Sequence, residues 1–344
     1  MQYKGSQQSN IVPTDNEFYF QWHFIESCNL RCKHCYQNDY SLSDLPREQL
    51  LSIARIIDKT LEKWGKIGRI SLTGGEPFIR KDLLIDLIEF FDKSSNCGQI
   101  GILTNGTLID DAIAINLKAF NKLGEIQVSI DGASPESHDR IRGMGSFDNA
   151  ISGIKILKNY GFYVSIMFTL HKLNKDEVLG VIDLAEQLGI DAITIERMTP
   201  MSPDDMQNFY LEPNELFDIY SRIYSKKIEL EQYSNLKIRV SRPLWTLIGE
   251  QIGGFCPAGL TSLCILHDGT VLPCRRLNVP IGNVLTDGLF KIWYTSDVLW
   301  KLRNKNLLAL KCRECKSLAN CGGCRAIAYQ VNGDFMAEDP QCWK

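Results

Sequence analysis

The chain has 344 residues, of which 44% are apolar and 23% charged, and its net charge is -3. This length suffices for one large domain and a small one, and the near-neutral charge without a basic run gives no sign of a nucleic-acid partner. No apolar stretch reaches the roughly 18 residues of a membrane span, and the polar N-terminus lacks a signal-peptide core, so we expect a cytoplasmic protein with no membrane partner.

Strand-like and helix-like segments alternate through the first 230 residues, beginning with the strand-like FYFQWHFI at 18–25. Helix patterns follow at 47–64, 81–93, 110–123, 147–160, 176–188 and 213–232, and strand patterns at 69–73, 99–104, 126–130, 163–170 and 192–197. The strands of these six strand–helix units are mostly apolar runs, as in parallel strands covered on both faces. Right-handed crossovers between them predict a rolled sheet or partial barrel of the α/β class.

Polar and glycine-rich loops follow several of the predicted strands. They are three cysteines after the first strand and the segments 73–77, 104–106, 129–132 and 196–197. In parallel α/β sheets ligands bind at the carboxyl ends of the strands, so we expect these loops to meet at one rim. Ordinary turn chemistry is an alternative for any single loop, but it explains several such loops beside a cysteine trio less well.

The twelve cysteines are unevenly placed, with three at 28–35, one at 97 and eight between 256 and 342. Disulfides are rare in a reducing compartment, so this clustering favours metal sites. Cys28, Cys32 and Cys35 supply only three ligands. The fourth ligand either comes from a distant part of the chain or is absent, which leaves a metal position open as a catalytic metal requires. Cys97 precedes the third strand on the opposite rim, where we expect a structural thiol.

The pattern changes after position 232. A strand-like LKIRV at 236–240 leads through proline and glycine residues into the cysteine-rich tail. We therefore expect an N-terminal extension at 1–17, a barrel at 18–232, a bridging segment at 233–254 and a small cysteine-rich domain at 255–344.

The loop CNLRCKHCY at 28–36 resembles the signature of the radical S-adenosylmethionine (SAM) enzymes, Cys-x3-Cys-x2-Cys followed by an aromatic residue. The tail resembles their accessory SPASM domain, with four residues between Gly269 and Cys274 and a late cysteine cluster. These resemblances imply a partial (β/α)6 barrel in which the trio binds three irons of a [4Fe–4S] cluster and SAM binds the fourth. Reductive cleavage of SAM then gives a 5′-deoxyadenosyl radical that removes hydrogen from the substrate.

The resemblance also implies contacts with SAM. The candidates are Tyr36, Gly74, Gly75, Glu76, Pro77, Ser129, Arg142, Asn174 and Arg197. Tyr36 would lie near the adenine, the Gly-Gly-Glu-Pro loop would approach and orient the methionine end, and Ser129 and Arg142 would hold its carboxylate or the ribose. Arg142 is equally well explained as a surface charge, and we expect Asp131 to cap its turn. His34 need not be a ligand.

For the tail the resemblance implies two auxiliary clusters, making three [4Fe–4S] clusters in all. One would be bound by Cys312, Cys315, Cys321 and Cys342, and the other by Cys256, Cys264, Cys274 and Cys324. Cys264, just before a predicted strand, could instead be a buried thiol that leaves an iron open. The two-residue spacing between Cys321 and Cys324 departs from the commonest pattern and puts the cluster of Cys324 in doubt.

Zinc is the rival metal for the tail. Two Cys-x2-Cys pairs, 312–315 and 321–324, could form a four-cysteine zinc site. The further cysteines in the SPASM pattern favour iron–sulfur clusters instead.

We expect a radical SAM oxidoreductase that matures a ribosomally made peptide. Only about 17 residues precede the first strand, so a separate protein or the barrel itself would recognise a peptide leader, and flavodoxin or ferredoxin would donate electrons. One alternative is a small-molecule substrate, such as a tetrapyrrole in haem-type cofactor biosynthesis. Another is a noncatalytic iron–sulfur electron carrier, which would need neither an open iron nor a Gly-Gly-Glu-Pro loop.

Overall fold

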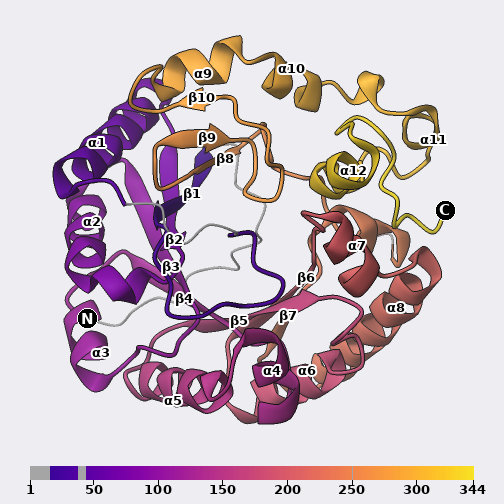
Figure 1. Ribbon diagram of the computed structural model, residues 1–344, viewed down its shortest axis with the longest axis horizontal. Helices are drawn as coiled ribbons and strands as arrows, with labels where there is room; N and C mark the ends of the chain where they lie inside the picture. The colour runs from indigo at the N-terminus through magenta and orange to yellow at the C-terminus, as the bar shows by residue number, and fades with distance from the viewer. Residues whose placement is uncertain (1–15, 38–43, 250) are drawn as a thin grey trace.

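A computed structural model describes residues 16–37, 44–249 and 251–344, and its centre is one sheet rolled into a partial barrel (Figure 1). The strand order is β10-β9-β8-β1-β2-β3-β4-β5-β6-β7. All pairs from β8 through β1 to β7 are parallel, and the pairs β8–β9 and β9–β10 are antiparallel. The predicted α/β partial barrel is therefore confirmed.

The barrel strands are β1 (Glu17–Ile25), β2 (Ile67–Gly74), β3 (Cys97–Thr104), β4 (Leu123–Ser129), β5 (Val164–Leu170), β6 (Ala192–Arg197) and β7 (Lys237–Arg239). Its helices are α1 (Arg47–Trp64), η1 (Pro77–Arg80), α2 (Lys81–Lys93), α3 (Asp111–Leu117), α4 (Pro135–Arg142), α5 (Ser146–Asn159), α6 (Val178–Gln187), α7 (Pro203–Phe209) and α8 (Pro213–Leu230). The predicted helix at 110–123 is too long, because Leu123 already begins β4 opposite Ile100 of β3. Among the described helices, none has the length and apolar character needed to span a bilayer.

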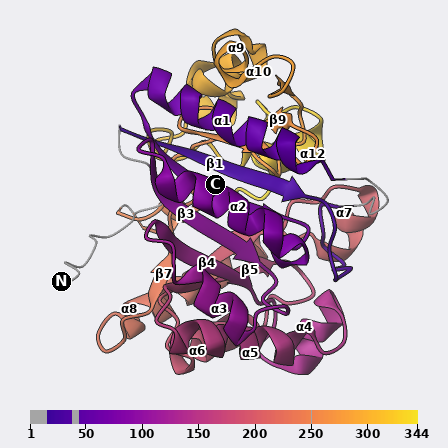
Figure 2. The same cartoon turned by 90° about the vertical axis from the view of Figure 1, so that its left-hand side faces the viewer.

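The two faces of β1 show how the sequence positions the site. Phe18, Phe20 and Trp22 are buried in the core on the outer face, where α1 and α2 cover the sheet (Figure 2). The alternate residues, including Tyr19 and His23, line a cavity on the inner face. The expectation of apolar packing on both faces is thus wrong for the inner face, which is polar because it encloses a cavity rather than a core.

The tail continues the barrel sheet. It comprises η2 (Pro243–Leu247), β8 (Ser262–Ile265), β9 (Thr270–Leu272), β10 (Gly282–Asn283), α9 (Leu289–Thr295), α10 (Asp297–Arg303), η3 (Lys305–Leu307), α11 (Leu310–Arg313) and α12 (Arg325–Asn332). β8 pairs with β1, with Cys264 opposite Gln21, and the tail completes the ring seen in Figure 1. The segment predicted to bridge the two domains also contains a barrel strand, since β7 pairs with β6.

Candidate functional site

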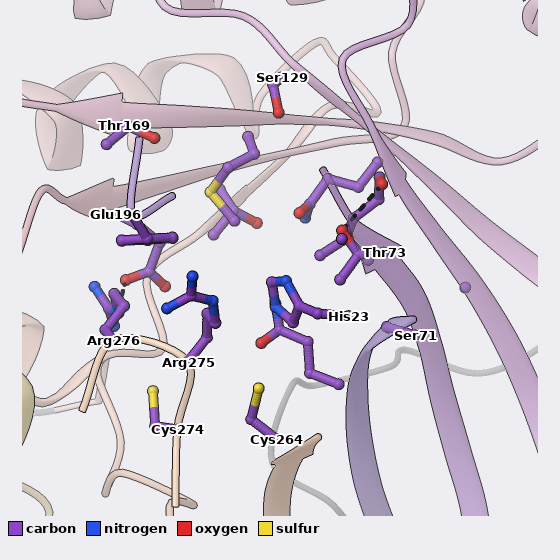
Figure 3. Close-up of a pocket in the computed structure, with 18 of the residues that line it drawn as sticks. His23, Ser71, Thr73, Ser129, Thr169, Glu196, Cys264, Cys274, Arg275 and Arg276 are labelled. Carbon is purple, nitrogen blue, oxygen red and sulfur yellow. Dashed lines mark hydrogen bonds and ion pairs between the residues drawn. The ribbon is translucent and has the colours of Figure 1, made fainter. Parts of the chain in front are cut away.

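A cavity of about 380 Å³ lies inside the partial barrel, and its wall combines side chains of the barrel strands with loops of the tail (Figure 3). The predicted site residues in this wall are Cys28, Cys32, Cys35, Tyr36, Gly74, Gly75, Ser129, Arg142, Arg197, Cys256, Cys264 and Cys274. Cysteines from the two ends of the chain therefore meet at one cavity, which we call the barrel cavity.

The three cysteines after β1 are half-buried in the wall of the barrel cavity. The backbone N–H groups of Leu30 and Gln37 donate to the Sγ atoms of Cys28 and Cys35, both at 3.4 Å. Burial raises the pKa of the Cys28 thiol to about 11, and its acidic and thiol neighbours add to the rise. Backbone donors to sulfur are one way in which proteins tune iron–sulfur sites, so this loop fits the predicted cluster.

The glycines after β2 allow two backbone segments to approach closely. The N–H of Gly75 donates to the carbonyl of Ile25 at 2.8 Å. A Cβ atom on Gly74 would lie 2.0 Å from the Ile25 oxygen, and one on Gly75 would lie 2.2 Å from the Ser27 oxygen, so only glycine fits. Both glycines thus hold the segment that leads into the cysteine loop, and their contact with SAM stays a prediction.

Glu76 and Pro77 are not among the residues in the wall of the barrel cavity. The Glu76 carboxyl group is buried and accepts hydrogen bonds from the Thr104 hydroxyl and the Asn105 N–H, both at 2.7 Å. The N–H of Phe78 supplies a third at 3.1 Å. Burial raises the pKa of Glu76 to about 7. Glu76 therefore joins the ends of β2 and β3, and orientation of SAM by this residue stays a prediction.

Asp131 does not act as the turn cap that the sequence predicts. Its carboxylate is fully buried and accepts hydrogen bonds from Arg142 Nε at 2.5 Å and the Thr169 N–H at 2.7 Å. A buried arginine held in this way is not a surface charge, so that alternative for Arg142 is wrong. Its Nη1 lies 3.8 Å from Cys32 Sγ, which places the guanidinium group beside the cysteine loop.

Asn174 and Arg197 are held by other protein groups. The Asn174 amide donates to the carbonyls of Asp131 and Thr169 at 3.2 and 3.0 Å, and this residue is not in the wall of the barrel cavity. Arg197 lines the cavity but donates to Asp339 at 2.8 Å, which joins β6 to the C-terminal segment. Contacts of either residue with SAM or substrate stay predictions.

The tail contributes Cys256, Cys264 and Cys274 to the barrel cavity. Burial raises the pKa of Cys256 to about 11, with Cys274 and Cys324 adding to the rise, so these three thiols are neighbours. Cys324 itself is buried just before α12. Cys264 lies within β8, not before a strand as the sequence predicts, and its side chain faces the cavity beside Cys274 (Figure 3).

The remaining tail cysteines gather elsewhere. A second cavity of about 50 Å³, the tail cavity, is lined by Cys312, Cys315, Cys321 and Cys342. A zinc site needs thiolates about 2.3 Å from one point, but among the described residues no group of His, Cys, Asp or Glu side chains could hold a single metal ion. The tail cavity groups Cys312, Cys315 and Cys321 with Cys342 rather than with Cys324, so it matches the predicted cluster set and not the four-cysteine zinc set, and the metal it binds stays a prediction.

Several residues of the barrel cavity are absent from the sequence-based candidates. Glu196 forms ion pairs with Arg242 and, at 3.2 Å, with Arg276. Arg275 lies over the ring of Tyr36, with 5.0 Å between the guanidinium carbon and the ring centroid. Strand alternation along β1 could have identified His23, whereas the arginine pairings depend on contacts between distant segments.

Two protein families match the chain. Residues 22–185 match the family described as Radical SAM superfamily. Residues 256–324 match SPASM, described as an iron–sulfur cluster-binding domain. The second description favours iron–sulfur clusters over zinc in the tail.

Curated relatives align with almost the whole chain. It is 31% identical to an AdoMet-dependent heme synthase of Methanosarcina barkeri (strain Fusaro / DSM 804), and the alignment covers 96% of this chain and 98% of that protein. It is 27% identical to the mycofactocin maturase MftC of Mycolicibacterium smegmatis, with 93% and 81% covered.

Solved structures share the fold. Streptococcus suis SuiB bound to S-adenosylmethionine has a TM-score of 0.76 and 18% identity, with 95% of this chain and 77% of SuiB covered. Native anSMEcpe with bound AdoMet has a TM-score of 0.73 and 20% identity, with 90% of each chain covered. At these identities the likeness concerns the fold alone.

Proposed function

Because this chain belongs to the radical SAM superfamily and carries a C-terminal SPASM domain, we propose that it modifies a tetrapyrrole in haem-type cofactor biosynthesis. The observation that carries the proposal is the similarity to an AdoMet-dependent heme synthase over nearly all of both chains. The sequence alone favours a peptide substrate, but the comparisons support the tetrapyrrole alternative better.

Three [4Fe–4S] clusters are part of the proposal. Cys28, Cys32 and Cys35 would bind the first, the four cysteines of the tail cavity would bind the second, and Cys256, Cys264, Cys274 and Cys324 would bind the third. The first cluster with SAM supplies a 5′-deoxyadenosyl radical that removes a hydrogen atom from the substrate. The protein's part is to orient SAM, with Arg142 and Ser129 as candidates, and to hold the reacting carbon nearby in an enclosed site.

The charge of the barrel cavity supports an anionic substrate. Its wall contains seven arginines, and four carboxylates pair with them, Glu125 and Glu196 in the wall and Asp131 and Asp339 outside it. Some of this positive charge would offset thiolate-bound clusters, and the surplus would attract anions into a partly enclosed site. Tetrapyrroles of haem-type pathways carry several carboxylate side chains, so this lining suits them.

A peptide substrate is the second candidate. It is favoured by the similarity to MftC, a named maturase, and a SuiB structure of the same fold is bound to its precursor peptide SuiA. For a peptide, a separate leader-recognition protein would be a further partner. Flavodoxin or ferredoxin is the proposed electron donor in either case.

The test uses the anaerobically reconstituted enzyme with SAM and a reductant. Iron coproporphyrin III, a carboxylate-rich tetrapyrrole, is the first candidate substrate. We expect a change in its mass that forms in proportion to 5′-deoxyadenosine, both measured by liquid chromatography with mass spectrometry. A panel of tetrapyrroles recovered unchanged, with equal 5′-deoxyadenosine in their absence, would reject the proposal. Modification of a short peptide encoded beside the gene would favour the second candidate.

A further inference from the structure

Arg275 differs from the other arginines of the barrel cavity. The other six each have a side-chain partner: Arg69 has Gln99, Arg142 has Asp131, Arg197 has Asp339, Arg239 has Glu125, and Arg242 and Arg276 share Glu196. Arg275 lies over the Tyr36 ring, but within residues 16–37, 44–249 and 251–344 it has no hydrogen bond or ion pair, and its Nε is buried without a partner. An enclosed guanidinium group without an anion is costly, so an anion is expected beside it in the working enzyme.

His23 also has a buried polar atom without a hydrogen-bond partner. It lies on the inner face of β1, only 7% exposed, and its Nε2 is buried without a partner. Burial lowers the pKa of His23 well below its usual range, and the positive charge of Arg275 lowers it further. The imidazole is therefore neutral beside Arg275, and it can donate one hydrogen bond to an anion.

The side chains of Arg275 and His23 point into the same part of the barrel cavity. In Figure 3 the guanidinium group of Arg275 and the ring of His23 both point into the middle of the barrel cavity, next to Cys264 and Cys274. Cys28, Cys32 and Cys35 line the same cavity. A group held between Arg275 and His23 would therefore share the enclosed space in which SAM is expected.

An auxiliary cluster could also supply negative charge near Arg275. However, a cluster bound through cysteine thiolates would leave Nε2 of His23 without a partner. A carboxylate satisfies both residues, because the planar guanidinium fork pairs with its two oxygens.

We propose that Arg275 and His23 form a subsite that binds one carboxylate side chain of the substrate and so sets which carbon faces SAM. This inference rests on the proposed function, because a tetrapyrrole supplies such carboxylates. The subsite adds to that function the two residues that would recognise a substrate carboxylate. Arg275 supplies charge and two parallel donors, and His23 supplies a single weaker donor.

The test measures binding of two probes to the anaerobically reconstituted enzyme. The probes are metal-free mesoporphyrin IX, which has two propionates, and its diamide, followed by fluorescence anisotropy. Hydrogen bonds to a charged group correspond to about tenfold to a hundredfold in affinity. We expect wild type to prefer the acid by that factor, and Arg275→Gln to lose the preference while its affinity for the diamide stays unchanged.

Two further variants separate the carboxylate role from other roles. Arg275→Lys keeps the charge but not the fork, so it should recover only part of the preference. His23→Phe should lower affinity for the acid by about threefold, as for loss of one modest hydrogen bond. Arg303→Gln removes an arginine of α10 that bonds to the Gly259 and Trp293 carbonyls outside the cavity, and its acid preference should match wild type.

Each negative outcome points to a different error. Wild type that binds neither probe would argue against the tetrapyrrole function itself. Wild type that prefers the acid, with Arg275→Gln showing the same preference, would overturn the subsite and leave the function standing. A third outcome combines full recovery of the acid preference in Arg275→Lys with an altered auxiliary-cluster signal in electron paramagnetic resonance of Arg275→Gln. It would show that Arg275 compensates the charge of the cluster, and it would also overturn the subsite.

Discussion

The barrel cavity and the tail cavity both collect cysteines, but they differ in size and chemistry. The barrel cavity, about 380 Å³, has seven arginines in its wall, whereas the tail cavity, about 50 Å³, has three leucines and two glycines beside its four cysteines, and its charged residues are Lys311, Asp339 and Lys344. A site for SAM and substrate needs room and polar groups. A cluster that only passes electrons is better held in a small apolar shell, which limits solvent access and tunes its potential. We therefore expect the same ligand type to serve two tasks, set by its surroundings.

The largest effect is expected at the trio of the barrel cavity. Replacing Cys28, Cys32 and Cys35 together with alanine should abolish 5′-deoxyadenosine formation, because the thiolates that hold the SAM cluster are gone. The tail clusters should persist, since their cysteines lie on separate segments. Product analysis and electron paramagnetic resonance of the reduced protein check both halves. Cys97→Ala, outside both cavities at the start of β3, is the control, and any 5′-deoxyadenosine from the triple variant would contradict the assignment.

The next effect concerns the tail cavity alone. Cys312→Ala combined with Cys315→Ala should remove one cluster, so iron should fall by about four from about twelve per chain. SAM cleavage with a chemical reductant should continue, because the barrel cavity keeps its ligands. Elemental analysis gives the iron count. Stoichiometric zinc in wild-type protein, with iron for one cluster only, would show that the two cavities do not both hold iron–sulfur clusters.

The ion pair between Arg197 and Asp339 connects the two regions, at 2.8 Å and nearly without solvent exposure. Asp339 also accepts the N–H of Cys324 at 2.7 Å. Asp339→Asn should lower the free energy of unfolding by about 3 kcal/mol, because it leaves the buried Arg197 charge with the neutral Gln341 side chain but no carboxylate partner. Anaerobic urea unfolding measures the change. Glu338→Gln, which removes a half-exposed partner of Lys311, should cost less than about 1 kcal/mol, and an equal loss in both variants would contradict the special role of the buried pair.

The barrel was more predictable from the sequence than the tail. Apolar residues repeat clearly in α1, α2 and β6, so their bounds agree with the prediction. The tail elements are short, and β8 gains its place by pairing with β1, far away in the chain. The resemblance to the SPASM pattern predicted that Cys256, Cys264 and Cys274 would gather apart from Cys312, Cys315, Cys321 and Cys342, and the two cavities show this separation. That Arg275 has no ion-pair partner among the described residues could not be predicted, since Glu196 pairs with Arg242 and Arg276 instead.

Cys264 gives the smallest expected effect and the sharpest test of how the two regions meet. It is buried on β8, opposite Gln21 of β1, and faces the barrel cavity beside Cys274. As a ligand it would complete four cysteines around one auxiliary cluster, and that cluster would pass electrons rather than bind substrate. As a free thiol it would stay neutral, because burial raises its pKa far above the usual range.

We expect ligation, so Cys264→Ala should change the spectrum and potential of one auxiliary cluster while SAM cleavage at the first cluster stays largely intact. The paired measurements are electron paramagnetic resonance of the reduced variant and its rate of 5′-deoxyadenosine formation. Cys97→Ala is the matched control, since it removes another buried thiol at the start of β3 and should leave both quantities unchanged. Auxiliary signals identical to wild type would make Cys264 part of the cavity wall only, and the iron beside it would then be open to substrate.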